Sequence, residues 1–462
     1  MKLKVNAVLD PQFAPMALKV REMRELTEEN GQKIVIAVQR NKGAVTTYRT
    51  RIFPDGTGHD EENYRFVERI VKTMLWVAGG YRIIIAGSDT VASRIKEAYT
   101  DGGYRDFDLH FMENVYEETF EVVSVPLAEA PTDISTAAPI GRHLDGCRIG
   151  FDAGGSDRKV SAVVNGESVF SEEVVWLPKV TADPQYHFDG IYTAMKTAAK
   201  HMPRVDAIGV SSAGIYIDNK IMVASLFLKV SPEDFQKHVK TMYLDVAKKL
   251  SEELGYDIPI EVANDGDVTA LAGAMNLNDD SVLGVAMGTS EAVGYVDPDG
   301  NITGWLNELA FAPVDFCEDS MVDEWSGDYG CGVKYFSQDA VIKLAPAAGI
   351  DLDPEMTPAE KLKVVQKLMA EGDERAAKIY DTIGCYFGYA LGYYAEFYEM
   401  KHVLIMGRVT SGKGGEILLS RAQDVLDIEF PELAKTCKLH IPDESSRRVG
   451  QSVAAASLPE LV

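Results

Sequence analysis

The stretch that decides the fold is Arg148-Ile149-Gly150-Phe151-Asp152-Ala153-Gly154-Gly155-Ser156, followed by the β-rich run 160–164 and the pair Asn165-Gly166. Its short apolar run predicts a strand that brings Asp152 to its end, and the two glycines predict a tight turn. Asn-Gly between β-rich runs favours a type I′ hairpin turn, because both central residues of that turn need a positive φ. The stretch therefore predicts a strand, a small loop and a hairpin.

The predicted loop carries groups that suit a phosphate and a metal ion. The backbone N–H groups of Gly154, Gly155 and Ser156 are available to an anion, and the carboxylate of Asp152 suits a hydrated divalent cation. An ordinary tight turn would explain two glycines equally well. The phosphate interpretation is favoured because the pattern occurs again in the chain.

The second occurrence begins with the apolar run Val282–Met287, which leads into Gly288-Thr289-Ser290 and returns through residues 292–296. Two such halves facing each other would clamp a triphosphate from both sides. A third strand, residues 402–406, is followed by a glycine-rich loop that contains Gly407 and Gly412. The repeated pattern of strand, small-residue loop and hairpin predicts a nucleotide-binding protein.

These segments resemble those of a known superfamily. Residues 152–156 resemble the first phosphate loop of the actin/sugar-kinase/heat-shock ATPase superfamily, and residues 288–290 resemble its second. Asn264-Asp265 is similar to the Asn-Asp of sugar kinases in the ROK (repressor, open reading frame, kinase) family. Asn307-Glu308-Leu309-Ala310-Phe311 resembles that family's Gly-Glu-Ile-Gly-His stretch. The resemblance runs from about Cys147 to the C-terminus.

The resemblance implies an α/β fold with two ribonuclease H-like halves around a nucleotide cleft. The first half is expected at residues 147–265, with the C-terminal helix 445–460 returning to it, and the second at residues 266–440. Residues 1–140 lie outside the resemblance and are expected to form an additional α/β domain of unknown role. This domain is rich in predicted strands and carries no basic recognition helix, which argues against a helix-turn-helix DNA-binding domain.

The resemblance also implies a reaction, namely ATP-dependent phosphoryl transfer to a hydroxyl group of a sugar or sugar-like substrate, with Mg²⁺ as a further cofactor. Asp265 would be the general base, although Asn264 and Asp265 could instead cap the helix that follows them. Ser212 and Gly214 follow another predicted strand, where small residues let a substrate approach the backbone. The further roles that the resemblance implies are Mg²⁺ binding through water by Asp152, substrate contacts by Asn264 and Glu308, and nucleotide contacts by Asp152, Gly154, Gly155, Ser156, Gly288, Thr289, Ser290, Gly407 and Gly412.

The chain departs from the family pattern at two places. Phe311 stands where the family commonly has a His that contacts the sugar, so an altered sugar preference is expected. Many ROK proteins also hold a zinc ion with one His and three Cys. The corresponding frame here keeps Cys331, whereas Glu324, Ser326 and Phe311 stand at the other positions. One thiolate does not make a tetrahedral zinc site, so no structural zinc is predicted.

The composition excludes several classes of protein. A net charge of −25 over 462 residues argues against a nucleic-acid partner, which would need a basic face. No apolar run reaches the roughly 20 residues of a membrane helix, and the N-terminus lacks a signal-peptide core. We therefore expect a cytoplasmic protein without a membrane partner, and a homodimer is left open. Five scattered cysteines without a Cys-x-x-Cys pair are expected to be free thiols.

Three other functions compete with a sugar kinase. A sensor that binds a sugar or nucleotide without catalysis is favoured by Phe311, by the incomplete zinc frame and by the acidic Glu291 in the second loop. An activator of an acyl-CoA dehydratase would need cysteines for an iron–sulfur cluster, and the spacing offers none. A carboxylate kinase would differ only in its acceptor, and an assay of ADP release with small organic acids would identify it.

Overall fold

The computed structural model describes residues 2–135, 140–442 and 444–461. The chain forms two compact units, and both are discontinuous in sequence. Unit 1 comprises Met1–Thr136, Val285–Val293 and Gly304–Ile441, and unit 2 comprises Ala137–Gly284, Gly294–Thr303 and Pro442–Val462. The N-terminal segment thus shares its unit with the part of the chain that follows the second predicted phosphate loop.

Unit 2 is built on a five-stranded sheet in the order β11-β8-β5-β6-β7. β8 runs parallel to both β5 and β11, whereas β6 and β7 are antiparallel to their neighbours, so the carboxyl ends of β5, β8 and β11 meet at one edge. Asn165 and Gly166 join β6 to β7 with φ values of 48° and 84°, which confirms the predicted hairpin. The bounds are β5 Cys147–Ala153, β6 Asp157–Val164, β7 Glu167–Val175, β8 Ala207–Ser212 and β11 Ile260–Asn264.

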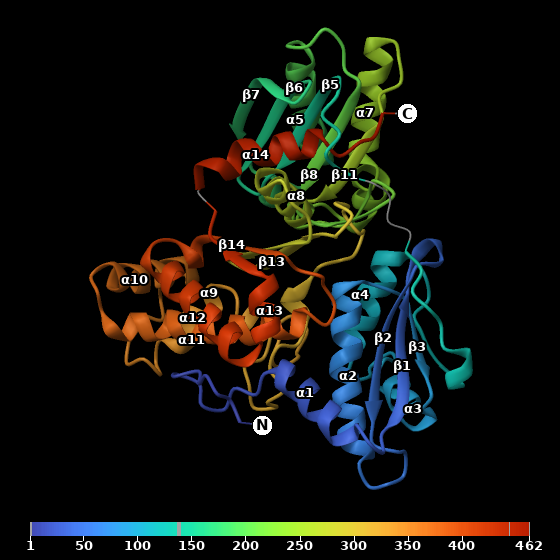
Figure 1. Ribbon diagram of the computed structural model, residues 1–462. Helices are drawn as coiled ribbons and strands as arrows, with labels where there is room; N and C mark the ends of the chain where they lie inside the picture. Colours follow the sequence, from blue (N-terminus) through green and yellow to red (C-terminus); the bar gives the residue numbers. More distant parts are fainter. Residues whose placement is uncertain (1, 136–139, 443, 462) are drawn as a thin grey trace. The chain divides into compact units, whose positions relative to one another are not determined.

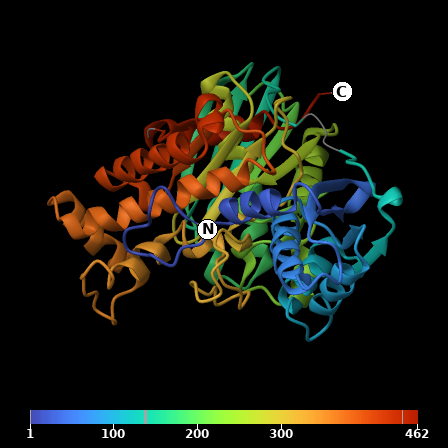
Figure 2. The ribbon, with the colours of Figure 1, turned by 60° about the horizontal axis from the view of Figure 1, so that its bottom comes forward.

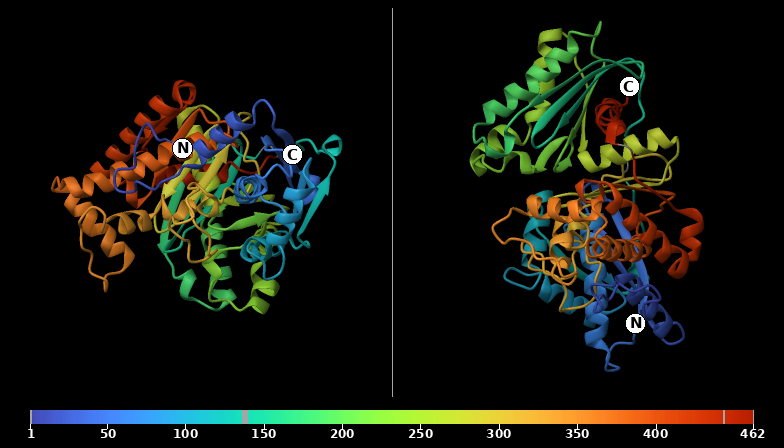
Figure 3. Two further views of the ribbon diagram at one scale, coloured as in Figure 1. Left: turned by 90° about the horizontal axis from the view of Figure 1, so that it is seen from below. Right: turned by 90° about the vertical axis from the view of Figure 1, so that its left-hand side faces the viewer.

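Helices cover both faces of this sheet, as Figure 1 and the right-hand view of Figure 3 show. α5 (Pro184–Ala199) and α7 (Met242–Leu254) lie on one face, and α8 (Asp265–Leu277) and α14 (Glu444–Ala456) lie on the other. Two strand glycines let α14 approach the sheet closely, since a Cβ atom at Gly209 would lie only 1.6 Å from the carbonyl oxygen of Ala455. The C-terminal helix is therefore packed directly on the strands that carry the first predicted loop.

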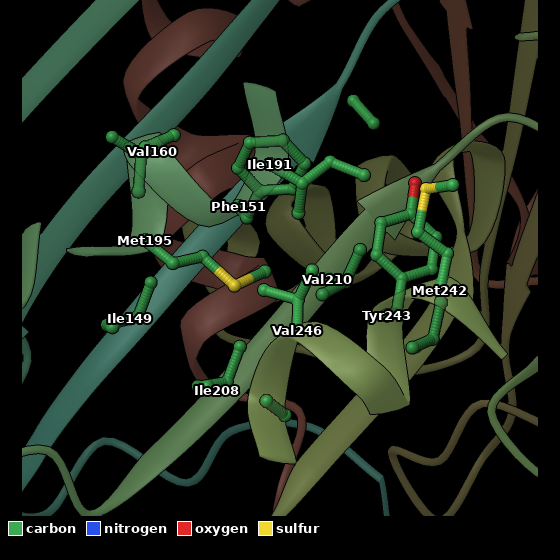
Figure 4. Packing of buried hydrophobic residues seen from close by; sticks show 14 of the residues in the cluster. Ile149, Phe151, Val160, Ile191, Met195, Ile208, Val210, Met242, Tyr243 and Val246 are labelled. Carbon is green, nitrogen blue, oxygen red and sulfur yellow. The ribbon is translucent and has the colours of Figure 1, made fainter. Parts of the chain in front are cut away.

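Apolar side chains fill the space between the sheet and its first helix layer. Figure 4 shows Ile149 and Phe151 of β5 packed against Met195 of α5 and Val246 of α7. This packing fixes β5 in the middle of a dry core and so fixes where its last residues emerge. The smaller elements of unit 2 are β9 Ile215–Ile217, β10 Lys220–Val223, η3 Pro178–Val180, η4 Ser225–Phe227, α6 Pro232–Asp234 and the π-helical η5 Phe235–Val239.

Residues 16–125 of unit 1 form a sheet with the order β2-β1-β3-β4 and four helices. β1 is antiparallel to β2 and β3, and β3 is parallel to β4. The apolar side of α2 packs on β1, so the sheet and helix share one core. The predicted division of the chain at residue 140 stays a prediction. The bounds are α1 Met16–Thr27, β1 Gln32–Gln39, β2 Val45–Ile52, α2 Asp60–Val77, β3 Arg82–Ala86, α3 Asp89–Ala98, α4 Asp106–Tyr116 and β4 Glu121–Val125.

A second sheet has the order β13-β12-β14-β15. β14, β15 and the parts of β12 and β13 within residues 285–293 belong to unit 1. Figure 2 shows the N-terminal segment running beside the orange and red helices of unit 1, where the Val5 N–H donates to the Tyr389 hydroxyl at 3.4 Å. No helix in the described residues is long and apolar enough to cross a membrane. The bounds are β12 Val282–Met287, β13 Glu291–Val296, α9 Gln338–Leu344, α10 Pro358–Ala370, α11 Glu374–Tyr394, β14 His402–Met406, α12 Lys413–Glu429, α13 Pro431–Thr436 and β15 Lys438–His440.

Candidate active site

Polar side chains gather at the edge of unit 2 where β5, β8 and β11 end. Asp152 is aligned with Ser211 of β8, whose hydroxyl donates to its Oδ1 at 2.9 Å. Asn264 ends β11 and caps α8, since its Oδ1 accepts from the Gly266 N–H at 2.7 Å. Asp265 is the first residue of α8 and is half-buried. The structure therefore brings the predicted metal-binding carboxylate and the predicted general base to the same sheet edge.

The two carboxyl groups stand in an environment that disfavours negative charge. Burial and the charge of Asp265 raise the pKa of Asp152 to about 6, against the lowering effect of the Ser211 hydrogen bond. Burial also raises the pKa of Asp265, and hydrogen bonding by the Gly266 N–H and the charge of Lys179 oppose that rise. A pair of carboxyl groups with raised pKa values at a strand edge is typical of a catalytic or cation-binding site.

Replacing Asp152 with asparagine is expected to stabilise the fold at neutral pH. The pKa of Asp152 is raised above its ordinary value of 3.8, so its contribution to stability falls as the pH rises from about 4 to about 6 and stays low above that. Thermal melts of both proteins should show a higher Tm for the variant at about pH 8. The corresponding gain in the free energy of unfolding should be no more than about 3 kcal/mol, at about 1.4 kcal/mol per pKa unit. The difference in Tm between the two proteins should shrink towards pH 5. Equal Tm values for the two proteins at both pH values would contradict the idea that the ionised Asp152 carboxylate destabilises the fold.

The first predicted loop is braced by the end of β7. The indole N–H of Trp176 donates to the Gly154 carbonyl at 2.7 Å, and the Trp176 backbone N–H donates to the Ser156 carbonyl at 3.1 Å. The Ser156 hydroxyl donates to Asp157 at 3.0 Å. The loop is thus held by its carbonyl groups and by one hydroxyl.

Lys179 lies against this loop and was not identified from the sequence. It belongs to η3, and a Cβ atom at Gly155 would lie 2.7 Å from its Cε and 2.9 Å from its Nζ. The turn η3, which carries Lys179, is held in place by the fully buried His187, since a ring nitrogen of His187 lies 3.1 Å from the Pro178 carbonyl oxygen. The glycine at position 155 lets the ammonium group lie directly against the loop, and Gly155 was the one signal that pointed to Lys179.

Two predicted substrate residues, Ser212 and Gly214, have structural partners. The Ser212 hydroxyl is completely buried and accepts a hydrogen bond from Tyr243 at 2.8 Å. The Gly214 carbonyl accepts from the side-chain amide of Asn264 at 2.7 Å. Both residues therefore hold Asn264 and the strand end in place, and their contact with a substrate stays a prediction.

The second predicted loop lies in unit 1. The Gly288 N–H donates to the Ser290 carbonyl at 2.9 Å, and the Thr289 hydroxyl accepts from the guanidinium of Arg408 at 3.1 Å. Gly407, with a φ of 98°, passes so close to β12 that a Cβ atom there would lie 2.3 Å from the Met287 carbonyl oxygen. The second and third glycine loops are therefore adjacent, and Arg408 adds a positive charge beside them.

A cavity of about 240 Å³ opens beside Gly412. Gly412 has a φ of 69°, and no atom lies near the place where its Cβ would be. Tyr380 forms one wall, and its buried hydroxyl has no hydrogen-bond partner among the described residues. The cavity suits a flat apolar group with a hydrogen-bonding edge. It is lined by Gln366, Met369, Ala370, Tyr380, Ser411, Gly412, Lys413 and Gly414.

Glu308 is held at the end of a helix from the N-terminal part of unit 1. The N–H groups of Asn307 and Glu308 donate to the carbonyls of Val77 and Trp76, at 3.0 and 2.9 Å, and so cap the C-terminal end of α2. Next to Glu308 lies Glu291, whose pKa is raised well above its usual value by burial and by the charge of Glu308. The predicted sugar-contacting carboxylate therefore depends on α2 for its position.

The frame in which no zinc was predicted has other partners. Phe311 packs on Trp76, Phe107 and Phe111, with ring centroids 4.4, 5.6 and 6.4 Å away. Glu324 forms an ion pair with Lys334, and the Ser326 hydroxyl donates to Asp323 at 2.6 Å. The absence of a structural zinc ion stays a prediction. Phe311, Glu324 and Ser326, at the positions where many ROK proteins have zinc ligands, each contact a different set of side chains.

The centre of this region is a buried ion cluster. The carboxylate of Asp328 lies 3.0 Å from Arg69, 3.1 Å from Lys72 and 2.9 Å from Arg105, and all four side chains are at most 2% exposed. Burial alone would raise the pKa of Asp328, but the charges of Arg69 and Lys72 hold it below its usual value. Asp328 therefore anchors the segment that follows Glu308 to α2 and α4.

Comparison with known proteins identifies the fold. No protein-family model matches the sequence, and no curated protein matches it. The structure is similar to a ROK hexokinase from Thermus thermophilus, with a TM-score of 0.50 and 16% identity over 67% of this chain and 97% of the hexokinase. It is equally similar to a ROK family transcriptional regulator, a homologue of the E. coli MLC protein, with a TM-score of 0.50 and 16% identity over 68% of this chain and 79% of the regulator. The chain has the predicted ROK-type α/β fold, with about a third of its length outside the match.

Proposed function

We propose that the protein transfers the γ-phosphoryl group of ATP to a hydroxyl group of a sugar or sugar-like molecule. The observation that carries this proposal is the pair of carboxyl groups, Asp152 and Asp265, at the carboxyl edge of a parallel sheet beside a glycine loop. Phosphoryl transfer needs little more than fixed donors, a metal-binding carboxylate and one base. The fold shared with a hexokinase supports the proposal.

In this proposal Asp265 accepts the proton of the acceptor hydroxyl group. The oxygen then bonds to the γ-phosphorus, and the bond from that phosphorus to the leaving ADP oxygen breaks. Asn264 cannot swing freely, because its amide is fixed by Gly266 and by Gly214, so it can orient the acceptor beside Asp265. Glu308 would accept hydrogen bonds from further hydroxyl groups. Positioning and charge stabilisation supply most of the rate enhancement.

Asp152 fits a hydrated Mg²⁺ ion. Its carboxylate accepts a side-chain hydrogen bond from Ser211, which leaves oxygen lone pairs for metal-bound water, and Mg²⁺ prefers such oxygen ligands. The pKa of Asp152 is raised by burial and by the charge of Asp265, and the charge of Lys159 does not offset them. When bound, Mg²⁺ would neutralise charge on the phosphate groups.

The nucleotide contacts are assigned to the three glycine loops. Backbone N–H groups of Gly154, Gly155, Ser156, Thr289 and Ser290 would meet the phosphate oxygens. Gly288 would contribute by leaving room for the phosphate, since its own N–H donates to the Ser290 carbonyl. Lys179 and Arg408 would add positive charge beside the first and second loops. The cavity of about 240 Å³ beside Gly412 has room for a purine and its ribose, with Tyr380 along one side.

The proposal is tested by following ADP release in a coupled assay. Purified protein with ATP and Mg²⁺ should release ADP only when an acceptor is added, and the acceptors to screen are hexoses, amino sugars, polyols and small organic acids. Because Phe311 replaces an imidazole near Glu308, we expect a sugar other than the plain aldohexoses to be preferred. ADP release with organic acids alone would identify a carboxylate kinase and would contradict the proposal.

A sensor without catalysis is the alternative, and the fold it shares with a ROK transcriptional regulator favours it. Phe311 also favours the sensor, since it packs into an aromatic cluster. Calorimetric titration with the same panel separates the two functions. Tight binding of a sugar without ADP release from any acceptor would establish the sensor.

Replacing Lys179 with methionine is expected to lower kcat about a hundredfold, as the loss of one charge-stabilising donor does in other enzymes. The KM of the acceptor should change little, because Lys179 faces Gly155 and not Asn264. Steady-state kinetics of ADP release will measure both constants. Lys200→Met, at the exposed residue that follows α5, is a matched control and should keep the wild-type rate. A Lys179→Met enzyme with an unchanged kcat would remove Lys179 from the mechanism.

The proposal extends to the location of the protein and to its partners. ATP as the donor and the absence of a membrane-spanning helix among the described residues fit a cytoplasmic enzyme. The net charge of −25 fits a small-molecule substrate better than a nucleic acid.

A further inference from the structure

A hollow of about 720 Å³ lies in the N-terminal part of unit 1, where β1 and β2 pass the C-terminal turn of α1. It is unrelated to the residues proposed for catalysis. Its volume is in the range of small-molecule sites. Its lining combines four basic side chains, two acidic ones, one hydroxyl and aliphatic groups. The lining residues are Arg24, Glu25, Glu28, Lys33, Ile34, Val35, Arg49, Thr50, Arg51 and Leu127.

The basic side chains of the hollow repel one another. In the register of β1 and β2, Lys33 is directly opposite Arg51, and the next position on the same face of β2 is Arg49. Like charges directly opposite on antiparallel strands destabilise a sheet. Three cations on one face of two strands are unexpected in a chain with a net charge of −25, unless an anion compensates them.

The protein itself leaves these three charges uncompensated. Arg49 and Arg51 donate to the carbonyls of Pro131 and Gly31, at 3.3 and 2.9 Å, and neither contact neutralises a charge. Lys33 has no ion-pair partner in the described part of the chain. The fourth cation, Arg24, is bound by Glu396. The strand side of the hollow therefore offers an anion three cationic groups without an ion-pair partner among the described residues.

The remaining lining indicates what the anion carries. Glu25 of α1 and Glu28, which follows the helix, accept hydrogen bonds but repel a second negative group, so they suit hydroxyl groups. The Thr50 hydroxyl is buried and has no hydrogen-bond partner among the described residues. Val35 and Leu127 add an apolar surface. A phosphate group fits the Arg and Lys side, and a hydroxylated body fits the side of α1.

We propose that this hollow binds the phosphate monoester of a small polyhydroxylated molecule. Guanidinium groups match phosphate oxygens in pairs, and a dianion balances two of the three uncompensated charges. The site is independent of the proposed kinase reaction, because it shares no residue with it.

Isothermal titration calorimetry with glucose 6-phosphate, glycerol 3-phosphate, inorganic phosphate and malate tests the proposal. The two esters should bind more tightly than phosphate, and malate should bind weakly. Lys33→Thr and Arg51→Thr keep residues that favour strands, and each should raise the Kd of the esters about tenfold or more. Lys96→Thr, an exposed lysine of α3, is the matched control and should leave the Kd unchanged.

A second measurement does not depend on the choice of ligand. Without any anion, Lys33→Thr should raise the Tm at low salt, and the gain should disappear at high salt because it comes from removing repulsion. The proposal is overturned if the wild type binds neither ester, if Lys33→Thr and Arg51→Thr bind both esters as the wild type does, or if malate binds as well as they do. A Tm that does not rise in Lys33→Thr would overturn the argument from like charges.

Discussion

Asp265→Asn should lower kcat by a factor of about 10² to 10⁴, the range that general-base catalysis contributes. The amide keeps the size of the side chain and can still accept from the Gly266 N–H, as the carboxylate does at 3.0 Å. It cannot accept the proton of an attacking hydroxyl group. The KM of ATP should therefore stay near its wild-type value while turnover is lost. Steady-state ADP release and the affinity for a non-hydrolysable ATP analogue will measure the two effects.

A control for this variant lies two residues further along the same helix. Asp267 accepts from the Tyr295 N–H at 3.0 Å, and an asparagine there keeps that acceptor. We expect Asp267→Asn to retain kcat within a few-fold. Thermal melts should show that Asp265→Asn is folded, and its burial predicts a Tm equal to or above that of the wild type. Wild-type kcat in Asp265→Asn would exclude this residue as the base.

The edge of unit 2 could be predicted from the sequence because its chemistry is local. An apolar run that ends in Asp152, and another that ends in Asn264-Asp265, each place a polar group at a strand end, and parallel pairing brings such ends together. Lys179 could not be predicted in this way. It reaches Gly155 only because Trp176 and His187 hold its turn against the loop, and these contacts arise from tertiary packing.

The role of α2 was equally hidden. The apolar residues of α2 follow helical spacing, but Arg69 and Lys72 fall between those positions, where a charged residue usually faces solvent. Both side chains are instead completely buried, because they are in contact with Asp328, which lies 259 residues after Arg69 in the chain. Periodicity reports which side of a helix is apolar. It carries no information on a partner that buries the polar side.

The second large effect is expected from Asp328→Ala. The substitution leaves Arg69, Lys72 and Arg105 buried without their shared carboxylate, and removing one member of a buried ion pair costs about 3–5 kcal/mol. Denaturant unfolding followed by fluorescence will measure the loss, since Trp76 packs beside this cluster and hydrogen bonds to Asp108 at 2.7 Å. The exposed Asp319→Ala, in the same segment, should change the free energy of unfolding by no more than about 0.5 kcal/mol.

The same cluster predicts a dependence on pH with a definite sign. Because the pKa of Asp328 is lowered in the folded protein, its stabilising contribution is present at neutral pH and is lost as the pH falls below the ordinary value of 3.8. Asp328→Ala should therefore differ most from the wild type near neutral pH and converge with it in acid. Glu68 and Asp108 have the opposite pH dependence, since burial raises their pKa values. Both proteins carry these two residues, so the difference between the wild type and Asp328→Ala still reports on Asp328.

A double substitution separates lost charge balance from lost shape. Asp328→Ala leaves three buried cations with two carboxylates, those of Glu68 and Asp108. Lys72→Met restores the balance of charge, so the double variant should recover part of the lost stability, with a coupling of about 1 kcal/mol or more. If Asp328 also positions Glu308 through the segment that it anchors, the folded single variant should show a raised KM for the acceptor and an unchanged KM for ATP. A free energy of unfolding of Asp328→Ala within about 1 kcal/mol of the wild type would show that Glu68 and Asp108 compensate the three cations without Asp328. In that case the anchor of this segment would have to be the aromatic contact between Phe311 and Trp76, whose ring centroids are 4.4 Å apart.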